Sequence, residues 1–308
     1  MKTGLRKQHS SLNPELLSAI SKLTIKVRRM VEGLQGGAHL SPHLGASVEF
    51  AEHKRYSPGD DIRHIDWRAL ARTDRYFVKQ HQREVILRGL LALDCSASMG
   101  YQGSRAEHSK LAFAVELLGA LAHILLQQGD AAGLMTFDTH PQHFIPPMRR
   151  PDHLTKLMHH LALARPQAKG GSGFLEAITQ IAEHMGRPAM VILVSDLWEA
   201  ERETEIALAR LAARGHDVIV FQILSPDEID LPFQLLSRFR GLEDDQLTEA
   251  DPALIRADYR QEISAFTDRW QRVCREAGID LVLAVTDRPV TSVLSEFISR
   301  RQTLGRRR

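Results

Sequence analysis

The sequence predicts an α/β protein whose sheet is doubly wound and mostly parallel. From residue 88 onward, short apolar runs of strand length alternate with helical segments of ten or more residues. Parallel neighbours need a long crossover connection, which is usually a helix, so this alternation favours a parallel sheet. In open sheets of this kind a ligand site lies outside the carboxyl ends of the strands.

The elements follow one another in a regular order. The expected elements are a strand at 89–93, a long helix ending near 128, strands at 131–137 and 142–145, helices at 152–164 and 174–185, and strands at 189–195, 217–224 and 279–285. Each of the last two strands follows a charged helix. The main α/β domain is therefore expected to span 85–300.

Four further segments flank or interrupt this domain. They are an N-terminal amphipathic helix at 1–35, a small β-rich segment at 36–84 packed on the main domain, a hairpin-like insertion at 225–252 and a basic tail at 301–308. The first has apolar residues near helical spacing, and the second combines glycines, a Ser-Pro-Gly turn and many charges. The insertion is where prolines and an acidic turn break the strand and helix rhythm.

Composition is that of an ordinary soluble protein, with 43% hydrophobic and 25% charged residues. The 40 basic and 38 acidic side chains are interspersed, so the net charge of +2 gives no support for a nucleic-acid partner. The exception is the basic end formed by Arg300, Arg301 and 306–308. It is either a solvated terminus or a contact for an anionic surface.

The cysteines and the apolar segments suggest a compartment. Cys95 and Cys274 are far apart in apolar or helical contexts, which argues against a disulfide framework and favours a reducing environment. The first residues do not resemble a secretory signal. The longest apolar segment, 111–126, contains Glu116 and His123 and is shorter than the roughly 20 residues of a membrane helix. We therefore expect a cytoplasmic protein without membrane insertion.

Oxygen-bearing side chains follow the first predicted strand. Asp94, Ser96 and Ser98 alternate in a loop that we expect to be extended, so a carboxylate and two hydroxyls would point the same way. These are hard oxygen donors, which Mg²⁺ prefers, and Mg²⁺ needs about six of them in an octahedral shell. The triplet would supply part of such a shell, for Mg²⁺ or for Mn²⁺ or Ca²⁺ in its place.

Two later positions can complete the shell. Ser172 follows Gly170-Gly171 before a helix, and Asp196 ends the strand at 189–195. With two carboxylates and neutral hydroxyls, a bound ion would keep net positive charge and an open position for an acidic side chain from outside. The alternative is local: Asp and Ser commonly cap backbone amides, and both Ser172 and Asp196 precede helices.

These five positions resemble the metal-ion-dependent adhesion site of von Willebrand factor A domains. That site has Asp-x-Ser-x-Ser after the first strand, a hydroxyl residue before a helix, and an Asp at a later strand end. The family usually has Thr where this chain has Ser172. Serine keeps the oxygen but lacks the methyl group that stiffens the side chain.

A second resemblance covers the chain from roughly Gly36 to Arg301. The matching residues are Glu49-Phe50, Arg55-Tyr56, Pro58-Gly59-Asp60-Asp61, Arg63, Ile65-Asp66-Trp67, Ala71-Arg72, Val78-Lys79, Ser225-Pro226-Asp227-Glu228, Leu231-Pro232-Phe233 and Asp251-Pro252. They are similar to the bacterial family called domain of unknown function 58, which joins such a segment to a von Willebrand A-like domain. The resemblance implies a MoxR-type AAA+ ATPase as a partner.

The charged cluster in the β-rich segment has two interpretations. It is either a set of ion pairs that fixes a poorly hydrophobic segment, or a contact surface for the ATPase or a client. The candidate contact residues are Arg55, Asp60, Asp61, Arg63, Asp66 and Trp67. Of these, Trp67 is more typical of packing.

Three functions remain open from the sequence. The first is a non-enzymatic adaptor or co-chaperone whose metal site binds an acidic residue of a partner protein. The second is a metal-assisted hydrolase such as a phosphatase, for which we find no nearby lysine and no second acidic cluster. The third is a structural protein with a vestigial site. The chain has no P-loop or dinucleotide fingerprint, so we do not expect it to hydrolyse ATP.

Overall fold

The computed structural model describes residues 53–55, 76–79, 86–167, 173–198, 202–243 and 246–305. These residues belong to two compact units, one that contains the described residues from Leu87 onward and one that contains those up to Ile86. In the smaller unit the described part is an antiparallel pair, β1 (His53–Arg55) and β2 (Phe77–Lys79). The predicted helix at 1–35 lies outside the described residues.

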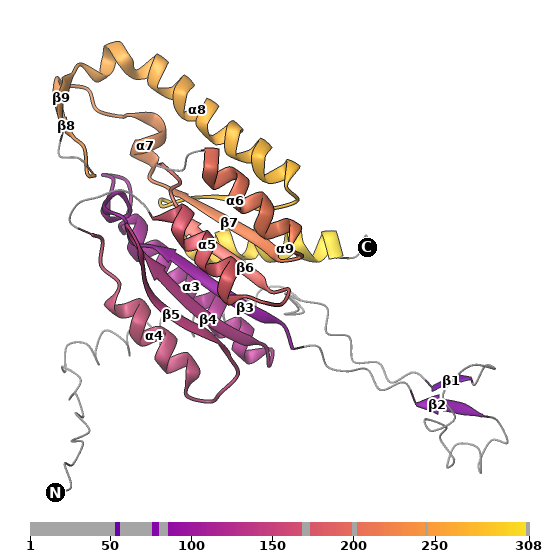
Figure 1. Ribbon diagram of the computed structural model, residues 1–308. Coiled ribbons are helices and arrows are strands. Elements are labelled where there is room, and N and C mark those ends of the chain that lie inside the picture. The colour runs from indigo at the N-terminus through magenta and orange to yellow at the C-terminus, as the bar shows by residue number, and fades with distance from the viewer. Residues whose placement is uncertain are drawn as a thin grey trace, which may run out of the picture. The chain divides into compact units, whose positions relative to one another are not determined.

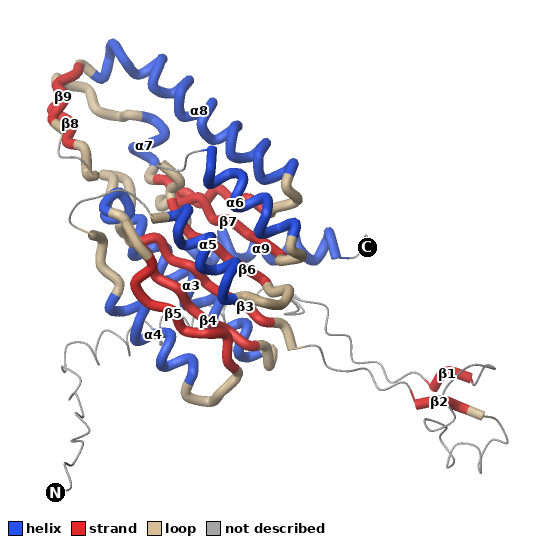
Figure 2. The backbone as a smooth tube through the Cα atoms, in the orientation of Figure 1, coloured by secondary structure: helices blue, strands red, loops and turns tan. Residues whose placement is uncertain are grey.

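The large unit is built on one six-stranded sheet (Figures 1 and 2). Its strands, in spatial order, are β10 (Asp280–Val285), β7 (Asp217–Leu224), β6 (Met190–Ser195), β3 (Arg88–Asp94), β4 (Ala131–Phe137) and β5 (Pro141–Met148). Every neighbouring pair is parallel except β4 with β5 at the edge. The predicted doubly wound, mostly parallel sheet is confirmed.

The strand order reverses between β3 and β6. The chain runs from β3 outward to β4 and β5, and then returns to the other side of β3 to begin β6. The loops after β3 and β6 therefore leave the sheet in opposite directions. In open α/β sheets this switch point opens a crevice at the carboxyl ends of the two strands, which is the usual ligand position.

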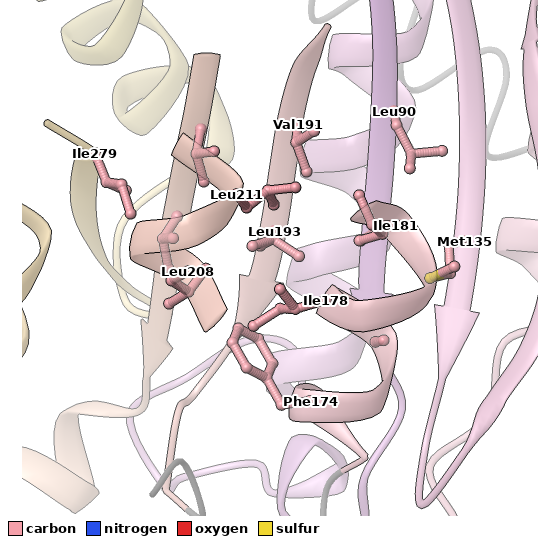
Figure 3. Close-up of a cluster of buried hydrophobic side chains, with 14 of the residues drawn as sticks. Leu90, Met135, Phe174, Ile178, Ile181, Val191, Leu193, Leu208, Leu211 and Ile279 are labelled. Atoms are coloured by element: carbon pink, nitrogen blue, oxygen red, sulfur yellow. The ribbon is translucent and has the colours of Figure 1, made fainter. Parts of the chain in front are cut away.

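Helices cover both faces of the sheet. They are α3 (Lys110–Gln127), α4 (His153–Leu163), α5 (Phe174–His184), α6 (Arg202–Ala213), α8 (Pro252–Glu276) and α9 (Val290–Gly305). On one face, Ile178 and Ile181 of α5 pack with Val191 and Leu193 of β6 in a buried cluster that also takes in α6 and α8 (Figure 3). On the other face α3 lies against α4 and α9.

The helix α3 is the apolar centre of the second face. It begins after Ser109, whose side chain accepts a hydrogen bond from the Ala112 amide. Its length and composition would suffice to cross a membrane, but 67% of it is buried inside the domain, as expected of a core helix. Because it is apolar nearly all round, the polar residue at its start, Lys110, needs a separate explanation.

The segment between β7 and α8 contains two structures. A short helix, α7 (Pro226–Asp230), is followed by the antiparallel hairpin of β8 (Ser237–Arg240) and β9 (Leu247–Ala250). At the start of α7, Ser225 and Glu228 stand at the two positions of a capping box, and the Glu228 side chain accepts a hydrogen bond of 2.7 Å from the Ser225 amide. At the other end of the chain, Arg301 pairs with Asp217 and Asp280. Arg301 is thus part of the domain surface.

Candidate metal centre

The carboxyl ends of β3 and β6 lie side by side. Their parallel register pairs Leu93 with Val194, so the next residues, Asp94 and Ser195, are neighbours across the sheet. The Ser195 hydroxyl donates to Asp94 Oδ2 at 2.6 Å. Both side chains are buried. The hydrogen bond fixes the Asp94 carboxylate at the switch point.

The loop after β3 folds back over this carboxylate. The Ser96 amide donates to Asp94 Oδ1 at 2.8 Å, and the hydroxyl oxygens of Ser96 and Ser98 are 3.2 Å apart. The expectation of an extended loop is wrong, because residues from Ala97 to Gly100 form a turn of 3₁₀ helix, η2. The turn nevertheless brings the two hydroxyls together, so the structure unites three of the five predicted residues.

Asp196 follows β6 directly and is buried beside a lysine. Its Oδ2 accepts a hydrogen bond from Lys110 Nζ at 2.7 Å, and its Oδ1 accepts from the Trp198 amide at 3.3 Å. Lys110 Nζ also donates to Glu228 Oε1 at 2.6 Å, and the lysine side chain has no exposed surface. The expectation that no lysine lies near the site is therefore wrong.

The pKa values of the buried Asp94 and Lys110 side chains depend on the acidic groups next to them. Burial, followed by the neighbouring charge of Asp196, raises the pKa of Asp94 to about 7, although hydrogen bonds from Ser195 and Ser96 oppose the rise. Burial alone would lower the pKa of Lys110, but Asp196 and Glu228 raise it above its ordinary value. Lys110 therefore stays charged, and a further cation would relieve the repulsion between Asp94 and Asp196.

Ser172 lies outside the described residues, but both sides of its loop are fixed at the same edge. The Gln167 amide donates to the Cys95 carbonyl at 2.8 Å, and the Gly173 amide donates to the Asp138 carbonyl. Gly173 has no room for a side chain, since a Cβ would meet the Asp138 carbonyl oxygen at 2.8 Å and the Thr139 backbone. The loop that carries Ser172 thus begins and ends next to the loops after β3 and β4.

The donor set fits a hard cation and not a zinc-type ion. Within the described part of the chain, no three His, Cys, Asp or Glu side chains are placed to hold a metal. The oxygens that converge are carboxylates together with hydroxyls, which is the chemistry of Mg²⁺ and not of a thiolate or imidazole site. Two ligands at right angles on Mg²⁺ are about 3 Å apart, close to the 3.2 Å between the Ser96 and Ser98 hydroxyls.

Comparison with known protein families identifies the family of the chain. The family model described as "Protein of unknown function DUF58" matches residues 52–269, well over half of the chain. The chain belongs to the DUF58 family. The fold of this DUF58 protein is the predicted α/β type with a mostly parallel sheet, and an antiparallel strand lies at one edge of that sheet.

Relatives of this DUF58 protein occur in mycobacteria. The uncharacterized proteins Rv1480 of Mycobacterium tuberculosis and Mb1516 of Mycobacterium bovis are each 27% identical over 294 residues, covering 94% of this chain and 91% of the relative. Among solved structures, the conserved hypothetical protein BatB of Bacteroides thetaiotaomicron is 19% identical, with a TM-score of 0.49 over 70% of this chain and 99% of BatB. Manganese-loaded TRAP protein of Plasmodium vivax is 13% identical, with a TM-score of 0.34 over 44% of this chain and 56% of TRAP.

Four residues of the site were not identified from the sequence of this DUF58 protein. They are Lys110, Ser195, Glu228 and Glu243. The pattern Ser-x-x-Glu at Ser225 and Glu228 indicates a capping box in the sequence. The hydrogen bond from Lys110 to Glu228 joins residues 118 apart, and no sequence pattern indicates it. Of the predicted contact residues, Asp60, Asp61, Arg63, Asp66 and Trp67 lie outside the described residues, and only the backbone of Arg55 is described.

Removing the buried lysine should destabilise the domain strongly. In Lys110→Met the carboxylates of Asp196 and Glu228 lose their shared cation, and breaking a buried pair in this way costs about 3 to 5 kcal/mol. Urea denaturation gives the free energy of unfolding. Lys156→Met, on the exposed face of α4, is the matched control. Equal, small effects of the two changes would contradict the assigned role of Lys110.

Adding a methyl group at Gly173 should also destabilise the site edge. Gly173→Ala places its Cβ against the Asp138 and Thr139 backbone, which cannot rotate away, so we expect a loss of about 1 to 3 kcal/mol. Gly186→Ala is the control, because a Cβ there meets nothing within 4 Å. Thermal unfolding of both variants provides the comparison. A Gly173 variant as stable as the Gly186 variant would show that the two loops are not in close contact.

Proposed function

We propose that this protein is a non-enzymatic, metal-dependent protein-interaction module that acts as an adaptor or co-chaperone. One Mg²⁺, or Mn²⁺ or Ca²⁺, would be held by Asp94, Ser96, Ser98, Ser172 and Asp196. The observation that supports this proposal most directly is that the Ser96 and Ser98 hydroxyls lie 3.2 Å apart beside the fully buried Asp94 carboxylate, at the switch point of the sheet. A bound ion would supply a positive coordination shell that a partner's carboxylate completes.

The chain's own residues have distinct parts in this proposal. Ser195 and the Ser96 amide orient Asp94 through hydrogen bonds to its two oxygens. Lys110 fixes Asp196 by a hydrogen bond and offsets part of its charge. The Asp196 carboxylate keeps further lone pairs that can bind a metal ion. Ser172 is included because its loop is fixed at both sides near the other donors. The hydrogen bonds that hold Asp94 and Asp196 would leave these two ligands little rearrangement to make on binding an ion.

The proposed partner is a protein that presents an acidic residue. The family resemblance points to a MoxR-type AAA+ ATPase, which the adaptor would couple to its client. The balanced charge of the chain supports a protein partner over nucleic acid. A cytoplasmic location without membrane insertion is part of the same proposal, supported by the burial of α3 within the domain.

A hydrolase is the second candidate, because Lys110 lies next to Asp196. A phosphatase could use Asp94 as nucleophile with a lysine to neutralise the phosphate. Here, however, Lys110 has no exposed surface and is bonded to two carboxylates, and both Asp94 oxygens already accept hydrogen bonds. If the wild type hydrolyses p-nitrophenyl phosphate and Asp94→Ala does not, the hydrolase becomes the favoured function in place of the adaptor.

Metal binding should be visible as a gain in stability. At a hundredfold excess over the dissociation constant, a ligand of the native state adds about 2.7 kcal/mol, which corresponds to about 5 to 10 °C in melting temperature for a domain of this size. Mg²⁺ should produce this shift in the wild type and in Ser292→Ala, an exposed control on α9. The double variant Ser96→Ala, Ser98→Ala should show little shift. No shift in the wild type would identify a vestigial site.

Partner capture should depend on the same carboxylate. A purified MoxR-type AAA+ ATPase from the same organism should bind the wild type in Mg²⁺ and be released by EDTA. Asp94→Ala should fold but bind the ATPase at least about tenfold more weakly, as expected when a metal ligand is removed. Circular dichroism confirms folding, and surface plasmon resonance gives the affinity. Capture that is equally strong in EDTA would exclude the metal-dependent mode.

A further inference from the structure

Three imidazole rings lie next to one another at the edge of the sheet. The ring centroid of His160 on α4 is 5.2 Å from that of His143 on β5 and 5.4 Å from that of His159, the preceding residue of α4. Nδ1 of His143 is 3.4 Å from the hydroxyl oxygen of Thr136 on β4. These three residues, the histidine cluster, therefore join α4 to β4 and β5, with His160 as the middle ring.

The histidine cluster holds one end of α4, and a further histidine holds the other. Nε2 of His153, in the first turn of α4, donates a hydrogen bond of 2.7 Å to the Ala132 carbonyl of β4, and the His153 side chain is buried. Between the two ends, the buried residues of α4 are Leu157, Met158 and Leu161. The carboxyl end of the helix thus depends on contacts among imidazole rings, whose charge changes near neutral pH.

A proton on His160 is unfavourable in the folded protein. Burial, followed by the charges of His143, His159 and Lys156, lowers the pKa of His160. A cation in the last turn of a helix is ordinarily favoured by the helix dipole, so these effects outweigh a favourable position. Among the described residues, no carboxylate is one of the groups that shift this pKa. The neighbours of His160 therefore favour its neutral form.

The charges on the adjacent elements do not oppose this effect. Within its bounds β4 has no titratable side chain, and β5 has only His143. On α4 itself, His153 lies at the far end of the helix and Lys156 lies one turn from the cluster. The helix α3, which lies against α4, carries three titratable groups: Lys110, Glu116 and His123. None of these three is among the groups that shift the pKa of His160.

We propose that the histidine cluster is an acid-sensitive latch, which holds the carboxyl end of α4 to β5 in neutral solution and releases it in acid. In the unfolded chain a histidine binds its proton near about pH 6.5, whereas the folded cluster resists that proton. The folded-state pKa of His160 lies below the unfolded value. Its contribution to stability is therefore complete above about pH 6.5 and is lost as the pH falls from there through the folded-state pKa.

Release of this end of α4 would extend to the edge of the candidate metal centre. The chain that leaves α4 leads to Gln167, whose amide donates a hydrogen bond of 2.8 Å to the Cys95 carbonyl, next to Asp94. The loop that carries Ser172 follows directly. The latch thus goes beyond the proposed function, because it would make the order of this loop depend on pH whether or not a metal is bound.

The pKa of His160 distinguishes a latch from simple packing. In His143→Gln a polar side chain remains on β5, but the positive charge that opposes protonation of His160 is lost, so the pKa of His160 should rise toward its ordinary value. His184→Gln is the matched control, because His184 packs against Phe144 of the same strand, with ring centroids 4.5 Å apart. Proton NMR of the full chain without added metal follows the imidazole signals against pH, and His160→Gln assigns the signal of His160. A pKa of His160 that is the same in the wild type and His143→Gln overturns the latch.

Hydrogen exchange of the amides at 153–163 measures the release itself. After correction for the intrinsic effect of pH on exchange, these amides should lose at least about threefold in protection between about pH 7.5 and about pH 5 in the wild type and His184→Gln. His160→Gln has no proton to gain at this position and should change little, and the amides of β6 serve as the internal reference. Unchanged protection in the wild type, or an equal loss in His160→Gln, overturns the latch. If His160→Gln does not fold, His143→Gln, altered at an exposed position, decides in its place: a loss equal to that of the wild type overturns the latch.

Discussion

The burial of like charges at the ends of two adjacent strands is the constraint on which the site depends. The register of β3 and β6 places Asp94 beside Ser195, with Asp196 one residue further, so two carboxylates lie at one edge out of water. Isolated buried carboxylates are costly unless they are bonded or paired. A hydroxyl and an amide bond to Asp94, and Lys110 pairs with Asp196. The remaining negative charge is what a metal ion would offset.

Lys110 connects this edge to the insertion that follows β7. Its ammonium group joins Asp196 to Glu228 of α7, and Glu228 also bonds to the amide of Ser225 at the start of that helix. The residue before Glu228, Asp227, accepts hydrogen bonds from Ser104 in the loop that follows η2. The first part of the insertion is thus fixed to the site from two directions. This connection explains why a polar residue, Lys110, stands at the start of the apolar core helix α3.

The fold was predictable because its signals are local, whereas parts of the site were not. Alternation of apolar runs and helical segments identified each strand of the sheet, and the polar residues at strand ends identified Asp94, Ser96 and Ser98. Lys110 resembled an ordinary first-turn residue, since nothing near it in the sequence indicates a bond to Glu228, 118 residues away. Glu243 stood in an acidic turn typical of a solvated loop. Contacts of such long range depend on how the insertion folds back, which periodicity does not encode.

The two ends of the insertion differ in how firmly they are held to the domain. The α7 end is held by a fully buried ammonium group and a capping box, so moving it would leave charges unpaired in the interior. The hairpin end buries little apolar surface and meets the site through the carboxylate of Glu243 on an amide of Ser98. Opening of the hairpin would therefore leave the ion pairs of Lys110 with Asp196 and Glu228 in place. The insertion thus combines an end that is anchored in the interior with an end that can open at low cost in free energy without unfolding the domain.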